Sequence, residues 1–219
     1  MKTVRIWFRK VGSARYISHL DLNRCMSRAM HKAKIPLWYT QGFNPHAFLV
    51  FALPLPLGIQ SERESLDVKL DDDAITREEL IPKMNSALPP DLAVFDVTEP
   101  VMKAGQITSA SYRLLLDPET ASAKEICDKI RALFELSEVL VPKHTKSGMI
   151  DFDLKPYLHH VEVSVKDQFV QIDAFLPAGS TMNVNPMLLL EAMKKYLGLD
   201  LYARMERLAL YDADGNLFE

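Results

Sequence analysis

Three cations repeat at intervals of four residues, at Arg24, Arg28 and Lys32. In a helix this spacing places the three side chains on one face, where like charges repel by about 0.2–0.5 kcal/mol per pair. A phosphate chain would neutralise them and release counterions, so the three residues are candidates for binding RNA. The alternative is a solvated helix face whose cations pair with acids elsewhere, such as the aspartates at 71–73.

The charge of the chain is unevenly distributed along its length. Residues 1–50 contain nine lysines and arginines but one acid, Asp21, which gives this segment a formal charge of +8. Because the whole chain carries −3, residues 51–219 carry −11. This asymmetry indicates a polyanion partner, provided that the cations converge in space. The nine cations are Lys2, Arg5, Arg9, Lys10, Arg15, Arg24, Arg28, Lys32 and Lys34.

The segment Gln-Gly-Phe-Asn-Pro-His, from Gln41 to His46, predicts a loop that could contact a base. Gly42 tolerates tight or positive-φ backbone, and Asn44 before a proline favours a turn. Phe43 would offer an aromatic ring on which a base can stack. Gln41 and His46 could bond to a base edge or to a phosphate. The alternative is that Phe43 packs in the core and that the loop serves the fold alone.

Arg15, Tyr16 and His19 lie at the expected start of the helix that carries the three cations. Ser18, with Asp21 three residues later, resembles a capping box. Backbone N–H groups and the dipole favour an anion at a helix N-terminus, so Tyr16 and His19 could frame a phosphate. The alternative is capping chemistry beside an exposed histidine.

The pattern of acids and histidines gives little support for catalysis. His19 and Asp21 could join His46 in a facial set of metal ligands, but only their spacing suggests it. The acids between Glu62 and Asp67 fit a solvated or edge-protecting strand. No P-loop, GxGxxG, GxSxG or HExxH motif occurs. We therefore expect no catalytic residue, no metal and no cofactor.

The two cysteines, Cys25 and Cys127, lie far apart and outside any CxxC motif. This arrangement predicts neither a disulfide framework nor a zinc site, and an iron–sulfur cluster needs about four thiolates. The most apolar stretch, residues 47–57, is interrupted by prolines and is shorter than the ~20 residues that span a bilayer. The N-terminus lacks the features of a signal peptide. We expect a cytoplasmic protein that does not enter a membrane.

Hydrophobic periodicity predicts an α+β protein of two tandem ferredoxin-like modules, each ordered βαββαβ with an antiparallel sheet. The first module is expected over residues 1–102 and the second over 106–219, with an insertion near 142–158. In the first module we expect strands at 3–8, 47–53, 62–70 and 92–97, with helices from Ser18 and from Thr76. In the second we expect strands at 109–116, 136–141, 161–165, 169–175 and 201–211, with helices from Asp117-Pro118 and Asn185-Pro186.

Several of these segments together resemble a bacterial family of unknown function, the radical-SAM-linked (radical-SAM-associated) domain family. In the first half they are Arg15-Tyr-Ile-Ser-His-Leu-Asp-Leu22, Arg28-Ala29, Gln41-Gly-Phe-Asn-Pro-His46, Pro54-Leu-Pro-Leu-Gly58 and Ser61-Glu62. In the second half they are Asp151-Phe-Asp-Leu-Lys-Pro-Tyr157 and Gly179-Ser-Thr-Met-Asn-Val-Asn-Pro186. Later members often carry arginine where this chain has Lys155 and Asn185.

The resemblance implies a stand-alone protein linked to a radical-SAM enzyme, in some members a cobalamin-binding one. Genes of the family often lie among RNA-processing and ribosomal genes. This chain lacks the CxxxCxxC motif, so radical chemistry would belong to the partner. We therefore expect a non-catalytic accessory subunit that binds RNA or a ribonucleoprotein and presents it to that enzyme.

Two alternatives remain open. One is a metal-independent endoribonuclease, because tandem ferredoxin-like modules resemble CRISPR repeat-RNA endonucleases. His19 or His46 would then act as acid or base, and Tyr16 or a lysine would stabilise charge. Against it, residues 170–219 lack the glycine-rich loop of those enzymes. The other alternative is a scaffold whose cations dock on an acidic surface of the radical-SAM enzyme and contact no RNA.

Overall fold

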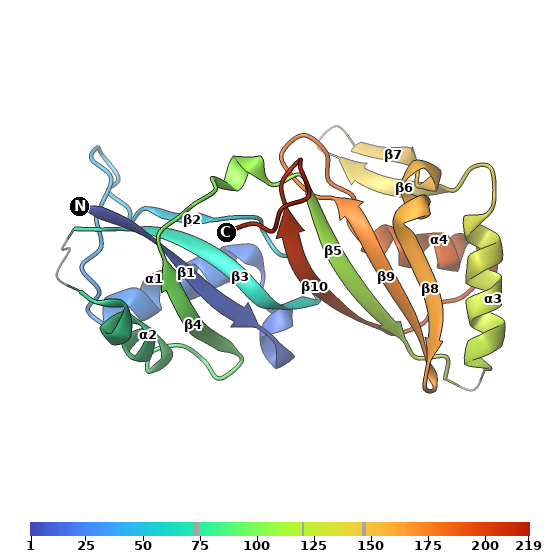
Figure 1. Ribbon diagram of the computed structural model, residues 1–219, viewed down its shortest axis with the longest axis horizontal. Helices are drawn as coiled ribbons and strands as arrows, with labels where there is room; N and C mark the ends of the chain where they lie inside the picture. The colour runs from blue at the N-terminus through green and yellow to red at the C-terminus, as the bar shows by residue number, and fades with distance from the viewer. Residues whose placement is uncertain (72–74, 120, 146–147) are drawn as a thin grey trace. The chain divides into compact units, whose positions relative to one another are not determined.

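The computed structural model describes residues 1–71, 75–119, 121–145 and 148–219 (Figure 1). It confirms an α+β protein with mainly antiparallel strand pairing. The chain forms two compact units, one of residues 1–107 with 207–219 and the other of residues 108–206. Residues 207–219 thus pack with the first unit, which the sequence did not suggest. Among the described residues, no helix combines the length and the apolar character that crossing a bilayer requires.

The first unit contains a sheet with the strand order β4-β1-β3-β10, and β2 pairs with β3. The pairs β1/β3, β1/β4 and β2/β3 are all antiparallel. The elements are β1 (Lys2–Lys10), η1 (Gly12–Tyr16), α1 (His19–Lys32), β2 (Leu49–Phe51), β3 (Ile59–Leu70), α2 (Arg77–Asn85), β4 (Leu92–Thr98), η2 (Ala104–Gln106) and the end of β10 (Ala203–Tyr211).

Alternation along the strands places one face of this sheet against both helices. Val4, Ile6 and Phe8 of β1 are buried in one core cluster with residues of β3, α1 and α2. The helix starts are set by capping, as predicted. Ser18 accepts a hydrogen bond from the Asp21 N–H, and Thr76 forms a reciprocal capping box.

Glu64 and Arg207 form an ion pair inside the first unit. Their side chains are 5% and 1% exposed, and Arg207 Nε donates to Glu64 Oε1 at 2.9 Å. Arg207 Nη2 also donates to the backbone carbonyl of Leu53 at 2.7 Å. The expectation of a solvated strand is therefore wrong for Glu64, because a cation on β10 makes burial of its charge possible. It holds for Glu62, which is exposed.

The second unit has the strand order β10-β5-β9-β8, with antiparallel pairs β5/β9 and β8/β9. A separate antiparallel hairpin, β6/β7, is set apart from this sheet (Figure 1). The elements are β5 (Ser109–Leu116), α3 (Ala123–Phe134), β6 (Leu140–Thr145), β7 (Gly148–Asp153), η3 (Lys155–His160), β8 (Val161–Lys166), β9 (Phe169–Pro177), α4 (Met187–Leu197) and the start of β10.

Two expectations for the second unit are wrong. The helix expected to begin at Asp117-Pro118 begins at Ala123, because Glu119 has φ 54° and Asp117 Oδ1 accepts from the Glu119 N–H in a turn. The strand expected at 136–141 is β6, which pairs with β7 and not with the main sheet. The hairpin around Lys166-Asp167 and the helix that follows Pro186 are confirmed.

The Glu64→Gln substitution should lower the free energy of unfolding by about 3–5 kcal/mol, because it removes the charge of the carboxylate that pairs with the buried Arg207. The matched control is Glu62→Gln on the same strand, where exposure limits the change to about 0.5 kcal/mol. Urea unfolding followed by circular dichroism measures both. Equal effects of the two substitutions would show that the pair is not important for stability.

Candidate nucleic-acid interface

Helix α1 presents a buried face and an exposed face, as its sequence predicts. Leu22, Met26, Ala29 and Met30 are buried against the sheet. Cys25 and Ala33 pack partly buried at the edge of the same core.

Arg24, Arg28 and Lys32 lie on the exposed face of α1. Four residues of helix advance about 6 Å, so their charges follow one another along the axis at that interval. Arg24 Nη1 lies 3.2 Å from Asp21 Oδ1 in an exposed pair. The pKa of Asp21 lies below its ordinary value, mainly because the Ser18 hydroxyl donates a hydrogen bond to the carboxylate. Arg24 lowers this pKa to a smaller extent. Within the described residues, neither Arg28 nor Lys32 lies within ion-pair distance of a carboxylate.

The proposed partners at 71–73 are described only in part. Asp71 is exposed, and its N–H donates to the Pro36 carbonyl at 2.8 Å, just beyond the end of α1. The other two aspartates lie outside the described residues. Asp71 forms no ion pair with α1 in the described part of the chain.

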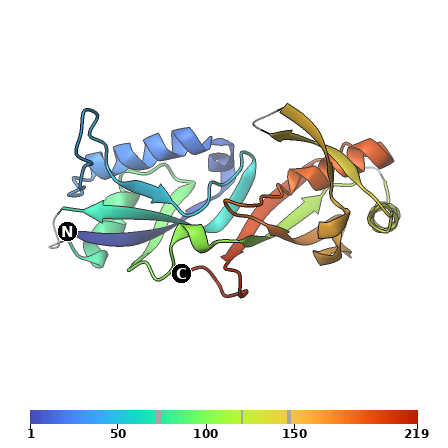
Figure 2. The same ribbon diagram turned by 90° about the horizontal axis from the view of Figure 1, so that it is seen from above.

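The loop from Gln41 to His46 projects as a narrow hairpin beside the C-terminal end of α1 (Figure 2). Its tip carries Phe43, whose relative exposure is 106%. The alternative that Phe43 packs in the core is therefore wrong. Gly42 has φ 139°, a conformation that favours glycine. Gln41 and Asn44 are also exposed.

Hydrogen bonds close this loop at its base. The Thr40 N–H donates to the His46 carbonyl at 2.9 Å, and the His46 N–H donates to Thr40 Oγ1 at 3.1 Å. His46 Nδ1 lies 3.1 Å from both Thr40 Oγ1 and the Asn44 carbonyl. Tyr39 connects the loop to α1, because its hydroxyl lies 2.9 Å from His31 Nε2. The loop is thus closed by its own hydrogen bonds and is held to the C-terminal end of α1, the helix that carries the three cations.

Arg15 and Tyr16 lie at the opposite end of α1, in η1. Tyr16 is 59% exposed, and the Arg15 guanidinium lies 4.8 Å from the centre of its ring. The Arg15 carbonyl accepts from the Gly58 N–H at 2.9 Å. Arg15 and Tyr16 therefore lie just before the start of α1, and the loop that carries Phe43 lies beside its C-terminal end.

His19 is half-buried, and its ring meets Phe51 edge-on with the centroids 5.0 Å apart. Its Nδ1 atom is buried without a hydrogen-bond partner among the described residues. Burial lowers the pKa of His19 below its ordinary value, and the positive charge of Lys10 lowers it further. A neutral, half-buried imidazole is poorly suited to attract a phosphate at pH 7.

Two cations from the first fifty residues lie inside the fold. Arg5 is fully buried, donating from Nε and Nη2 to Asp67 at 2.7 and 2.8 Å and from Nη2 to the Met102 carbonyl at 2.6 Å. Lys10 is also fully buried, and its Nζ donates to the Ile17 carbonyl at 2.9 Å. Burial lowers the pKa of Lys10. The condition that the nine cations converge in space is therefore not met by these two.

Strand alternation could have placed Arg5 on the face of the sheet opposite the helices, away from the cations of α1. Val4 and Ile6 point to the helices, so Arg5 must share the other face of β1 with Trp7. The sequence does not reveal that Phe218 packs over Arg5 and covers this face of β1. The centre of the Phe218 ring lies 4.3 Å from Arg5 Cζ. Nor does the sequence reveal Arg207, which contacts Glu64 across 143 positions of sequence.

Comparison with known families now identifies the chain at family level. Residues 3–186 match the profile of a family described as "Uncharacterized protein conserved in bacteria (DUF2344)". The chain belongs to DUF2344. No curated protein matches it. The description of the family names no activity.

The second-half motifs of this DUF2344 protein make local structural contacts. Lys155 Nζ donates to the Phe134 carbonyl at 2.6 Å, which caps the C-terminal end of α3. Asp153 Oδ1 accepts from the N–H groups of Val139 and Lys155. Asn185 Oδ1 accepts from the Met187 N–H at the start of α4.

The imidazole of His19 should titrate below its ordinary value near 6.5 in the folded protein. Because the unfolded chain then binds a proton more readily, stability should decrease as pH falls from about 6.5 through the folded-state pKa. NMR titration of the ring protons measures the first effect. Urea unfolding at several pH values measures the second.

The His19→Gln variant provides the control. It should show a weaker loss of stability over the same pH interval, because glutamine does not titrate. A titration of His19 at or above the ordinary value near 6.5 would contradict the assignment.

Proposed function

We propose that this DUF2344 protein binds single-stranded RNA, with phosphates along the exposed face of α1 and one base stacked on Phe43. The observation that carries the proposal is the fully exposed Phe43 on a closed loop, beside the end of a helix with three outward cations. The chemistry is that of single-strand binding proteins, which combine a cationic track with an aromatic platform.

The loop geometry supports stacking. An aromatic ring that stays in water contributes nothing to the core, whereas stacking of a base on such a ring is worth about 1–3 kcal/mol. The bonds between Thr40 and His46 close the loop before any ligand arrives. A preformed loop loses less conformational entropy on binding, so more of the stacking energy appears as affinity.

The electrostatics support a phosphate track of moderate length. Arg28 and Lys32 have no carboxylate partner within the described residues, and Arg24 has only the exposed Asp21. A phosphate beside each cation would relieve their mutual repulsion and release counterions. Arg15 and Tyr16 would extend the same contact to the start of the helix.

We also propose that each unit is a ferredoxin-like module. The first unit runs βαββαβ with the spatial order β4-β1-β3-β2. In the second unit, with the β6/β7 hairpin set aside as an insertion, the corresponding order is β10-β5-β9-β8. Both orders fit the split βαβ arrangement.

The chain would act as the accessory subunit of a radical-SAM enzyme, presenting RNA or a ribonucleoprotein to it. This part of the proposal rests on the resemblance in the first-half and second-half motifs. With two cysteines, one half-buried and one buried, the chain is not equipped to hold an iron–sulfur cluster by itself.

The Arg24→Ala/Arg28→Ala double variant should bind a single-stranded RNA oligonucleotide about tenfold more weakly. Its plot of log K against log salt should be shallower by about 1–2, because two phosphate contacts are lost. Fluorescence anisotropy at several salt concentrations measures both quantities. The matched control is Lys124→Ala/Lys129→Ala, which removes two exposed cations of α3. Equal losses in both variants would refute the track on α1.

The Phe43→Ala variant should weaken RNA binding by about 1–3 kcal/mol without changing the salt slope, because stacking does not release counterions. Phe43→Tyr should retain most of the affinity, since it keeps an aromatic ring. Quenching of 2-aminopurine in the oligonucleotide reports the stacking directly.

Two outcomes of these experiments would favour the other functions. Cleavage of the RNA by the pure protein would indicate an endoribonuclease. Absence of RNA affinity, together with nuclease-resistant capture of a radical-SAM enzyme, would indicate a scaffold.

A further inference from the structure

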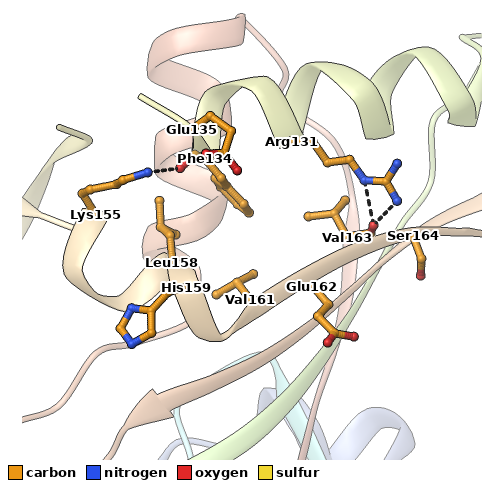
Figure 3. Close-up of a pocket in the computed structure, with 10 residues that line it drawn as sticks. All are labelled: Arg131, Phe134, Glu135, Lys155, Leu158, His159, Val161, Glu162, Val163 and Ser164. Atoms are coloured by element: carbon orange, nitrogen blue, oxygen red, sulfur yellow. Dashed lines mark hydrogen bonds between the residues drawn. The ribbon is translucent and has the colours of Figure 1, made fainter. Parts of the chain in front are cut away.

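A groove in the second unit runs beside strand β8, with a cavity of about 570 Å³ (Figure 3). The last turn of α3 forms one wall, and η3 with β8 forms the other. Apolar side chains line its inner part, and polar or charged side chains lie at its rim. The apolar residues are Phe134, Leu158, Val161 and Val163, and Arg131 lies among the charged ones.

Strand β8 is the edge strand of its sheet, and alternate backbone groups point away from β9. The two-residue turn at 167–168 makes Lys166 and Phe169 a hydrogen-bonded pair, so Val163 and Val165 direct their N–H and C=O groups outward. Arg131 confirms this direction, because its Nη2 donates to the Val163 carbonyl at 2.6 Å. The Val163 N–H and both groups of Val165 remain open among the described residues.

The edge strand of the first unit's sheet differs in this respect. On β4, the Asn85 side chain donates to the Val94 carbonyl and accepts from the Val94 N–H, both at 2.8 Å. That amide closes the outward groups of Val94 in the way that a neighbouring strand would. On β8 the Val161 N–H is bonded to the Leu158 carbonyl and the Val163 carbonyl to Arg131, while the groups from the Val163 N–H to Val165 have no such partner among the described residues. The groove borders this edge of the strand.

We propose that β8 pairs with β8 of a second copy of this chain, antiparallel and centred on Ser164. In this register Val163 lies opposite Val165 of the second copy, and both residues have outward-pointing backbone groups. Each such pair exchanges two N–H···O=C bonds, as in an antiparallel ladder. The Val163 carbonyl already accepts from Arg131 Nε at 3.1 Å and Nη2 at 2.6 Å. Because a carbonyl oxygen has two lone pairs, a bond from the second copy would replace one of these two.

The side chains of β8 are complementary to themselves in this register. Glu162 lies opposite Lys166 of the second copy, and the two-fold axis repeats this pair of opposite charges. Val165, which is 46% exposed, would be covered by Val163 of the second copy on the side of the apolar groove. A shift by one residue would place valines opposite polar side chains, so the pattern selects this register.

Charge exchange tests the proposal. Lys166→Glu places like charges opposite each other and should raise the dimer dissociation constant about tenfold. Glu162→Lys should act in the same direction. The double variant Glu162→Lys/Lys166→Glu restores opposite charges and should return the constant to near its original value. Sedimentation equilibrium over a concentration series measures all four proteins, and circular dichroism verifies that each is folded.

A second measurement is independent of the substitutions. Amide hydrogen exchange at Val163 and Val165 should slow as protein concentration rises, while that at Val94 should not change. A chain that stays monomeric at about 0.1 mM would overturn the proposal. So would a dimer that Lys166→Glu does not weaken, or one that the double exchange fails to restore.

Discussion

Glu64 lies on β3 with its carboxylate removed from water, and Arg207 supplies the opposite charge from β10. Neither group can remain ionised there alone, because desolvation of a single charge costs several kcal/mol. Arg207 therefore fixes the end of β10 on β3, and through the Leu53 carbonyl it also holds the turn that follows β2.

The same polar region determines how α1 is presented. Lys10 donates to the Ile17 carbonyl immediately before the helix, and the turn after β2 is joined to η1 through the bond from Gly58 to the Arg15 carbonyl. The helix start is thus tied to the sheet by buried polar contacts, while its exposed face carries cations. The cations of the first fifty residues therefore have two roles. Arg5 and Lys10 of β1 make buried polar contacts that stabilise the fold, whereas the cations of α1 are exposed to solvent.

Local patterns predicted the parts of this protein that local interactions determine. The buried face of α1, the caps at Ser18 and Thr76, and the β8/β9 hairpin follow from spacing and turn chemistry. The start of α3 was missed because the turn at Asp117 imitates a helix cap.

Of the candidate site, the sequence could predict the exposed charges of α1 but not the exposure of Phe43. An aromatic residue between Gly42 and Asn44 is compatible with either a core contact or a loop tip, and only the closing bonds between Thr40 and His46 decide it. The burial of Arg5 and Lys10 depends on carboxylates and carbonyls distant in sequence, so charge counting overestimates the cationic surface.

The two tryptophans of the chain, Trp7 and Trp38, both lie in the first unit. Trp7 is buried and meets the ring of Phe218, whereas Trp38 is half-buried at the base of the loop and contacts Lys69. Intrinsic tryptophan emission therefore reports on the first unit alone, with one fluorophore near the C-terminal segment and the other near the candidate site. Residues 108–206 contain no tryptophan, so unfolding confined to that unit has no tryptophan of its own to report it.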